Sequence, residues 1–265
     1  MVYDDFDIWS IEIKNNQLIT NKLTKGRAQN IRYRNVRLDY DIRYTNSKEM
    51  MLYGFNKTTK SSGFYRLNYK NRTAKPLIEV AAEVDFIAKA KNTNQLVFTK
   101  ETFEIFPDLY VTNLDFKNPK KISNANPQQA NYNWGTVEMM TYTNLDGKEL
   151  QGLIYKPENF DPNKKYPMLV YFYEKYTDRL HRYYAPRPLR SAVNFTYLAS
   201  NDYIVFVPDI IYKDGYPGQS AYNCIMPAVQ KMMNESYINT EKMGIQGHSW
   251  GGYQTAYLVT RTNLF

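Results

Sequence analysis

The stretch that decides the fold is Lys242-Met243-Gly244-Ile245-Gln246-Gly247-His248-Ser249-Trp250-Gly251-Gly252-Tyr253, which contains the pattern G-x-S-x-G. This pattern is typical of a nucleophile elbow, a sharp turn from a strand into a helix with a reactive serine at its apex. The turn strains the backbone of the serine and exposes its hydroxyl. Glycines flank it because larger side chains would collide across so tight a turn. The sequence therefore predicts Ser249 as a nucleophile, with Gly247, Gly251 and Gly252 in its elbow.

The flanks of the motif agree with this interpretation. Met243–Gln246 reads as a short strand, and Tyr253–Arg261 reads as a helix without proline. G-x-S-x-G also arises by chance, so the alternative is a glycine-rich turn that happens to hold a serine. The strand and the helix on either side favour the nucleophile.

The segment before the elbow alternates between strand and helix patterns. Thr136–Thr143 and Lys148–Lys156 alternate around an Asp-Gly pair, which indicates a hairpin. The elements expected after it are strand Met168–Tyr173, helix Arg190–Ser200, strand Tyr203–Val207, helix Ala221–Asn234 and strand Met243–Gln246. This alternation predicts a mostly parallel sheet with helices on both faces, which is the first half of an α/β-hydrolase domain, over 134–265.

Residues 1 to about 130 show a weak repeat in place of a helical period. Trp9, Tyr65 and Tyr110 share a local pattern, and each is followed by a polar turn and a short apolar stretch. A repeat of this kind is typical of β-propeller blades, although an ordinary meander sheet is the alternative. We predict the last blades of a propeller over 1–133, with the polar segment Ser123–Asn133 as the boundary. Two or three blades do not close a ring, so earlier blades are expected before Met1.

Composition excludes several classes of protein. The 34 Lys and Arg residues are mixed with 26 Asp and Glu, which favours a solvated surface over nucleic-acid binding. The apolar runs are shorter than the ~18 residues of a membrane span, which predicts a soluble protein. Cys224 is alone, so no internal disulfide, metal cluster or cofactor is expected, and a buried helical thiol is predicted. The chain starts without a secretory signal, which leaves cytoplasmic, periplasmic and secreted locations open.

Acyl transfer needs two donors aimed at the oxyanion. The backbone N–H of Trp250, the residue after the nucleophile, is one of them. The second is expected after the strand Met168–Tyr173, where Glu174-Lys175-Tyr176 stands in place of the usual glycines. The phenol of Tyr173 is a candidate for this donor. The alternative is one more core tyrosine among 25.

Taken together, these residues resemble the prolyl oligopeptidase family of serine peptidases, particularly its dipeptidyl-peptidase IV-like and acylaminoacyl-peptidase-like branches. The resemblance lies in Lys165–Tyr173, Tyr203–Asp209 with Gly215–Gly218, and Gly247–Tyr253, and in Phe106–Val111 with Asn126-Pro127 for the last blade. It implies a propeller that gates access to an α/β-hydrolase domain, and cleavage of short peptides through an acyl-enzyme.

The resemblance also implies roles for single residues. Ser249 matches the nucleophile, Tyr173 the side-chain oxyanion donor and Trp250 the backbone donor. The ring of Trp250 would wall the pocket for the residue before the scissile bond. The departure at Glu174-Lys175-Tyr176 puts the shape of that pocket in doubt.

No residue of this chain is predicted as the triad acid or base. In this fold the triad runs in the order Ser, Asp or Glu, His, whereas His181 and His248 both precede Ser249. Asp209 also comes too early and is expected to be a structural hydrogen-bond acceptor. The triad Asp and His are therefore expected beyond Phe265, in a longer peptidase of which this chain is an internal fragment, nearly inactive by itself.

The remaining basic cluster is interpreted as a solvated flap, with a clamp for a substrate carboxylate as the alternative. It consists of Arg179, His181, Arg182, Arg187 and Arg190. Two other functions compete with the peptidase: an esterase or lipase on the same fold, and a non-catalytic binding protein. An open sheet edge also leaves homo-oligomerisation as a possibility.

Overall fold

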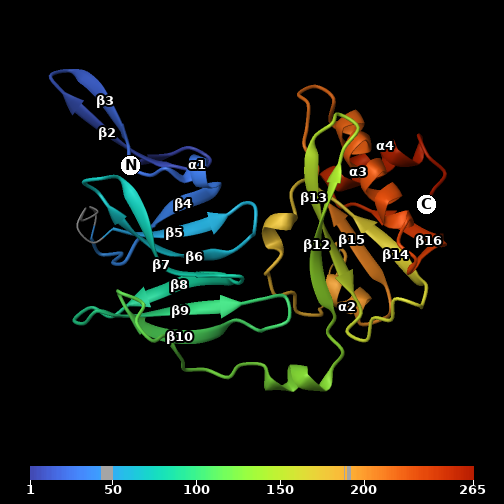
Figure 1. Ribbon diagram of the computed structural model, residues 1–265, viewed down its shortest axis with the longest axis horizontal. Helices are drawn as coiled ribbons and strands as arrows, with labels where there is room; N and C mark the ends of the chain where they lie inside the picture. Colours follow the sequence, from blue (N-terminus) through green and yellow to red (C-terminus); the bar gives the residue numbers. More distant parts are fainter. Residues whose placement is uncertain (43–49, 188, 190–191) are drawn as a thin grey trace. The chain divides into compact units, whose positions relative to one another are not determined.

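The computed structural model describes residues 1–42, 50–187, 189 and 192–265. The chain divides into two compact units, Met1–Asn126 and Pro127–Phe265 (Figure 1). The division falls inside the polar segment Ser123–Asn133 but before residue 133, because the 3-10 helix η1 (Pro127–Asn131) groups with the second unit.

The first unit consists of three antiparallel sheets and a short helix, α1 (Gly26–Gln29). The sheets are β1 (Val2–Tyr3), β2 (Ile8–Lys14) and β3 (Gln17–Lys22); β4 (Ile31–Val36), β5 (Met51–Asn56), β6 (Ser62–Asn68) and β7 (Thr73–Val80); and β8 (Glu83–Lys89), β9 (Gln95–Glu101), β10 (Asp108–Asn113) and β11 (Lys120–Lys121). Trp9, Tyr65 and Tyr110 lie in β2, β6 and β10, the second-last strand of each sheet. Each copy of the sequence repeat therefore corresponds to one of the three sheets.

The middle sheet of this unit supplies both of its apolar cores. Successive residues of a strand point to opposite faces of the sheet. Leu52 and Tyr65 accordingly pack with Ile8 in one core, whereas their neighbours Met51 and Phe64 pack with residues of the third sheet in the other. A shift of the register by one residue would exchange the two faces, so burial on both sides specifies the strand pairing.

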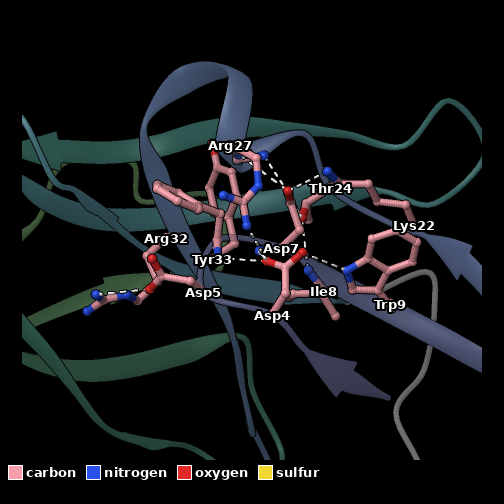
Figure 2. A network of polar contacts seen from close by, with 12 residues as sticks. Asp4, Asp5, Asp7, Ile8, Trp9, Lys22, Thr24, Arg27, Arg32 and Tyr33 are labelled. Atoms are coloured by element: carbon pink, nitrogen blue, oxygen red, sulfur yellow. Dashed lines mark hydrogen bonds and ion pairs between the residues drawn. The ribbon is translucent and has the colours of Figure 1, made fainter. Parts of the chain in front are cut away.

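A buried carboxylate joins the first sheet to α1. Asp7 is fully buried and accepts hydrogen bonds from the Thr24 hydroxyl (2.7 Å) and the Gly26 backbone N–H, and Lys22 Nζ lies 2.6 Å from it (Figure 2). The Thr24 hydroxyl also accepts from the Ile8 backbone N–H at 3.0 Å. One carboxylate thus ties the start of β2 to the segment that follows β3.

The third sheet repeats this arrangement with different residues. Asp108 accepts from the Ser123 hydroxyl (2.6 Å) and the Ala125 N–H (2.8 Å), and Lys121 Nζ lies 2.5 Å away. The Ser123 hydroxyl accepts from the Leu109 N–H at 2.8 Å, as Thr24 does from Ile8. The same chemistry therefore closes the first and third sheets, which supports their common origin as repeats.

Replacing Asp7 with asparagine is expected to lower the free energy of unfolding by about 2 kcal/mol, because it leaves buried donors without a charged acceptor. Burial raises the pKa of Asp7, but the hydrogen bonds from Lys22, Thr24 and Gly26 outweigh it and keep this pKa below its ordinary value. The stabilisation is then present above the unfolded-state pKa, about 3.9, and is lost as the pH falls through the lower folded-state value.

Urea denaturation at several pH values measures this effect. The matched control is Asp115→Asn, which removes a carboxylate that pairs with Arg66 at the surface (2.8 Å) and should leave stability nearly unchanged. A gap between wild type and Asp7→Asn that stays constant down to pH 2 contradicts the prediction.

The second unit contains one five-stranded sheet in the order β12-β13-β15-β14-β16. Its strands are β12 (Thr136–Thr143), β13 (Glu149–Lys156), β14 (Tyr166–Tyr171), β15 (Ile204–Pro208) and β16 (Ile238–Gln246). The β12–β13 hairpin is confirmed. The sheet is mixed rather than mostly parallel: β14 pairs with β15 and β16 in parallel, but β13 joins β15 antiparallel. The hairpin therefore lies beside β15, which the order of patterns along the chain did not reveal.

Helices cover both faces of this sheet, as predicted. Helix α3 (Pro217–Met233) buries Cys224 and Ile225 in a core with Ile154 and Val170. On the opposite face, Phe195 of α2 (Phe195–Ala199) stacks on Tyr155, the neighbour of Ile154, with ring centroids 4.7 Å apart. Successive side chains of β13 thus point alternately to the two faces of the sheet, one toward α3 and the next toward α2.

Two element boundaries predicted from the sequence are wrong. The expected helix Arg190–Ser200 is the shorter α2, because Asn194 caps it by accepting from the Tyr197 N–H at 2.8 Å; Arg190 lies outside the described residues. Strand β16 begins at Ile238, where it pairs with Tyr166, and not at Met243. The first part of β16, Asn239–Lys242, is polar, so a search for apolar runs does not detect it as a strand.

Candidate active site

Ser249 sits at the junction of β16 and α4 (Trp250–Val259), at the N-cap of the helix. Its backbone has φ 54° and ψ −114°, outside the region that L-residues favour. The Ser249 side chain is exposed, and its backbone oxygen accepts from the Gly252 N–H at 2.9 Å. The strained strand-to-helix turn predicted from G-x-S-x-G is therefore present, with the hydroxyl open to solvent.

Two glycines make this turn sterically possible. A Cβ added at Gly247 would lie 2.1 Å from the Gly251 oxygen, and one added at Gly251 would lie 2.6 Å from the Phe172 oxygen. A Cβ at Gly252 would meet only the Gly247 oxygen at 3.5 Å, an ordinary contact. Gly247 and Gly251 are thus required by close backbone approach, whereas Gly252 is not.

Trp250 combines a free backbone donor with an exposed ring. As the first residue of α4, its N–H lies in the turn that a helix leaves without internal acceptors, and no acceptor for it occurs among the described residues. Its indole Nε1 donates to the Tyr212 hydroxyl at 3.2 Å, and its ring lies 5.1 Å from that of Tyr253. The N–H is therefore available to a substrate oxygen.

Tyr173 lies two residues beyond the end of β14 and is 38% exposed, so it is not a core tyrosine. Its backbone oxygen accepts from the Tyr212 hydroxyl at 2.7 Å and from Gln254 Nε2 at 3.1 Å. Gln254 is fully buried in α4 and also donates to the Tyr212 hydroxyl. These bonds attach the Tyr173 backbone directly to the helix that carries Ser249 at its head.

A pocket of about 570 Å³ brings Tyr173 and Ser249 together, a volume within the range of small-molecule sites. Its lining consists of Tyr171, Tyr173, Glu174, Lys175, Tyr176, Arg179, Ala192, His248 and Ser249. Arg179, which was interpreted as part of a solvated flap, thus faces the same space as the predicted nucleophile.

Asp209 holds the loop that forms one wall of this pocket. It is 7% exposed and accepts from the backbone N–H groups of Tyr176 (2.7 Å) and Thr177 (3.0 Å) and from the Thr177 hydroxyl. The prediction of Asp209 as a structural acceptor is confirmed. These bonds anchor the short 3-10 helix η2 (Thr177–Arg179) to the end of the sheet.

Neither histidine has the surroundings of a catalytic base for Ser249. His181 does not line the pocket, and burial lowers its pKa, with its Nε2 atom buried and lacking a hydrogen-bond partner among the described residues. His248 lines the pocket, but it is the chain neighbour of Ser249 on the sharp turn. The described residues of the site therefore bring together the predicted nucleophile and the candidate oxyanion donors, and neither histidine is a good candidate for the base.

Outside the pocket, three features of the described residues bear on other functions: the cysteine, the grouping of metal-ligating side chains and the length of the apolar helices. Cys224 is a fully buried thiol in α3, as predicted, and burial raises its pKa. Within the described ranges, no group of three His, Cys, Asp or Glu side chains is placed to hold a metal ion. Nor does that part of the chain contain a helix long and apolar enough to cross a membrane.

Sequence reasoning missed two residues that organise this site, Tyr212 and Gln254, which meet it only in the folded chain. A signal existed for Gln254, a polar residue four positions after Trp250 in a helix of small and apolar residues. Tyr212 resembles an ordinary tyrosine in a sequence rich in them. Arg179 was named in the basic cluster, and its place in the lining of the pocket agrees with the alternative of a carboxylate clamp rather than with a solvated flap.

Comparisons with known proteins agree with this geometry. A sequence model of the prolyl oligopeptidase family matches residues 190–265, which include the elbow. Dipeptidyl-peptidase 5 of Porphyromonas endodontalis is 24% identical over 213 residues, which make up 75% of this chain and 29% of that protein. The chain thus spans less than a third of the length of this curated relative.

Solved structures show the same fold at low identity. Porphyromonas gingivalis dipeptidyl peptidase 4 superimposes with a TM-score of 0.68 and 16% identity over 98% of this chain and 38% of its own. The Pyrococcus horikoshii acylaminoacyl peptidase superimposes with a TM-score of 0.61 and 17% identity over 81% of this chain and 34% of its own. The chain is thus similar in sequence to the prolyl oligopeptidase family over residues 190–265, and it shares the fold of these two peptidases.

Proposed function

We propose that this chain is part of a serine peptidase that hydrolyses short peptides through an acyl-enzyme at Ser249. The observation that carries the proposal is the strained, exposed Ser249 at the head of α4, beside a pocket that Tyr173 also lines. The peptide substrates in this proposal are inferred from the similarity to the prolyl oligopeptidase family and to dipeptidyl-peptidase 5, and not from the site alone.

In the first step, Ser249 Oγ attacks the carbonyl carbon of the scissile bond and gives up its proton to a base. The negative charge then moves to the carbonyl oxygen, where the Trp250 N–H and the Tyr173 phenol donate to it. Collapse of this intermediate breaks the C–N bond, the amine leaves with a proton from the base, and water hydrolyses the ester. The base is a histidine from a segment other than those that carry His181 and His248.

The domain organisation belongs to the same proposal. We assign the three antiparallel sheets, over 1–133, to blades of a propeller and 134–265 to the first half of an α/β-hydrolase domain. The repeated carboxylate clamps of Asp7 and Asp108 support repeated blades, and the strand-elbow-helix order of β16, Ser249 and α4 supports the hydrolase.

The test is covalent labelling of the complete protein, which contains the base, with a fluorophosphonate that reports an activated serine. Labelling at Ser249, identified by peptide mass spectrometry and abolished in Ser249→Ala, is the expected result. Ser123, which donates its hydroxyl to Asp108, should stay unlabelled as an internal control. Absence of label at Ser249 in the complete protein would support the non-catalytic binding function instead.

The choice of substrate distinguishes a peptidase from an esterase on the same fold. The complete protein is expected to hydrolyse an aminoacyl-arylamide with a kcat/KM comparable to that of the matching aryl ester. Hydrolysis of the ester alone would favour the esterase.

A further inference from the structure

The space around Ser249 has two chemically different sides. On one side, the rings of Trp250, Tyr212 and Tyr253 form an aromatic wall, with Trp250 lying 6.4 Å from Tyr212 and 5.1 Å from Tyr253. On the other side, the pocket that contains Ser249 adds charged side chains to its tyrosines. Besides Tyr171, Tyr173 and Tyr176, it is lined by Glu174, Lys175, Arg179 and His248. None of the three aromatic rings belongs to that pocket among the residues described.

We propose that the polar side binds the leaving group of the peptide, and that Arg179 with Lys175 receives a carboxylate from it. This inference rests on the proposed function, since only acyl transfer at Ser249 defines a leaving group. The two halves of a peptide substrate extend in opposite directions from the attacked carbonyl. The resemblance to the prolyl oligopeptidase family implies that the ring of Trp250 lies at the acyl half, which leaves the polar pocket for the residues after the scissile bond.

Arg179 has the chemistry that a carboxylate needs. Its side chain is exposed, lines the pocket, and forms no ion pair with a carboxylate among the described residues. Its guanidinium carbon lies 4.9 Å from the centre of the Tyr176 ring, which holds the flat group in one orientation. A planar guanidinium binds a carboxylate through two parallel hydrogen bonds, so an arginine that stacks on a ring and has no carboxylate partner among the described residues suits such a ligand.

The backbone that carries Arg179 is firmly supported. Arg179 ends η2, whose first residue, Thr177, is bound to the buried Asp209 carboxylate through both its backbone N–H and its hydroxyl. The Arg179 N–H itself donates to the Tyr176 oxygen at 2.8 Å. A binding group on a supported segment loses less conformational freedom when it meets its ligand.

Among the described residues that line the pocket, Glu174 is the one carboxylate and would oppose an anionic ligand, whereas Lys175 and Arg179 attract it. Removing the Glu174 charge should therefore strengthen the binding of a carboxylate.

The carboxylate has two sources in a short peptide: the free C-terminus and an acidic side chain. Three dipeptide probes distinguish them: Ala-Ala with a free C-terminus, Ala-Ala amide, and Asp-Ala amide. Calorimetric titration of the 265-residue chain measures their binding without requiring turnover. One of the two carboxylate probes is expected to bind roughly tenfold more tightly than Ala-Ala amide.

Variants then assign this preference to the proposed residues. Arg179→Gln is expected to remove it while leaving the binding of Ala-Ala amide unchanged, and Glu174→Gln is expected to increase it. The matched control is Arg261→Gln, because the Arg261 guanidinium stacks on Tyr257 at the same 4.9 Å but does not line the pocket. Circular dichroism of each variant checks that the fold is kept.

Equal binding of all three probes to the wild-type chain overturns the inference, whatever the variants do. So does a carboxylate preference that survives in Arg179→Gln. Fluorophosphonate labelling of the complete protein, which contains the base, tests the proposed function separately. Labelled Ser249 without a carboxylate preference rejects this ligand alone, and a preference without labelling rejects acyl transfer alone.

Discussion

Replacing Tyr173 with phenylalanine is expected to lower kcat by a factor on the order of 10² to 10³, with little change in KM, because one oxyanion donor acts mainly in the transition state. The phenol is free for this role, since the hydrogen bonds of Tyr173 to Tyr212 and Gln254 use its backbone oxygen. Tyr173→Phe keeps those bonds and the ring, so the loop should stay in place.

Steady-state hydrolysis of an aminoacyl-arylamide by the complete protein measures this loss. The fluorophosphonate labelling rate of Ser249 reports it where turnover is absent, because the same donors stabilise the attacked phosphoryl oxygen. Tyr203→Phe is the matched control: Tyr203 belongs to the same unit and is 39% exposed, against 38% for Tyr173. An unchanged kcat in Tyr173→Phe would remove the phenol from the mechanism and leave the second donor to be found elsewhere.

Replacing Gly247 with alanine is expected to lower the free energy of unfolding by about 3 kcal/mol and to abolish the labelling of Ser249. The new Cβ would lie 2.1 Å from the Gly251 oxygen and 2.2 Å from its carbonyl carbon, both of them backbone atoms that no side-chain rotation can move away. The turn must therefore open, which displaces both Ser249 and the Trp250 N–H.

Gly252→Ala is the matched control, and it is expected not to destabilise the protein. Its Cβ meets only an ordinary 3.5 Å contact, and alanine is the better helix former inside α4, so stability should be unchanged or rise by up to about 1 kcal/mol. Urea denaturation followed by tryptophan fluorescence compares the two variants. If both variants lost a similar free energy of unfolding, the close backbone contact at Gly247 would not be the reason for glycine there.

Much of the fold was readable in the sequence where the determining contacts are local. The Asp-Gly hairpin of β12 and β13 and the turn at Ser249 each depend on residues a few positions apart, so a short pattern contains nearly all the information. The repeated aromatic residues Trp9, Tyr65 and Tyr110 likewise mark equivalent strands. Each of these predictions needs only a short segment of contiguous sequence.

Pairings across long loops were not readable in this way. The polar first half of β16 carries no apolar pattern, and its partner Tyr166 lies far back in the chain. The antiparallel edge formed by β13 beside β15 depends on which strand edges remain free, which the order of elements does not specify. The short helix α2 begins where Asn194 caps it, inside a longer stretch that reads as helical.

By itself, the sequence determined the strained turn at Ser249, the two kinds of secondary structure in the two halves and the similarity to the prolyl oligopeptidase family, because these are properties of short contiguous segments. Only the tertiary structure decided how Gln254 and Tyr212 hold the backbone of Tyr173, how Asp209 supports the pocket wall, and that Arg179 faces Ser249. The reason is physical. A hydrogen bond or a pocket wall depends on where side chains lie in space, and side chains from distant segments meet only after the sheet has paired and the helices have packed on it.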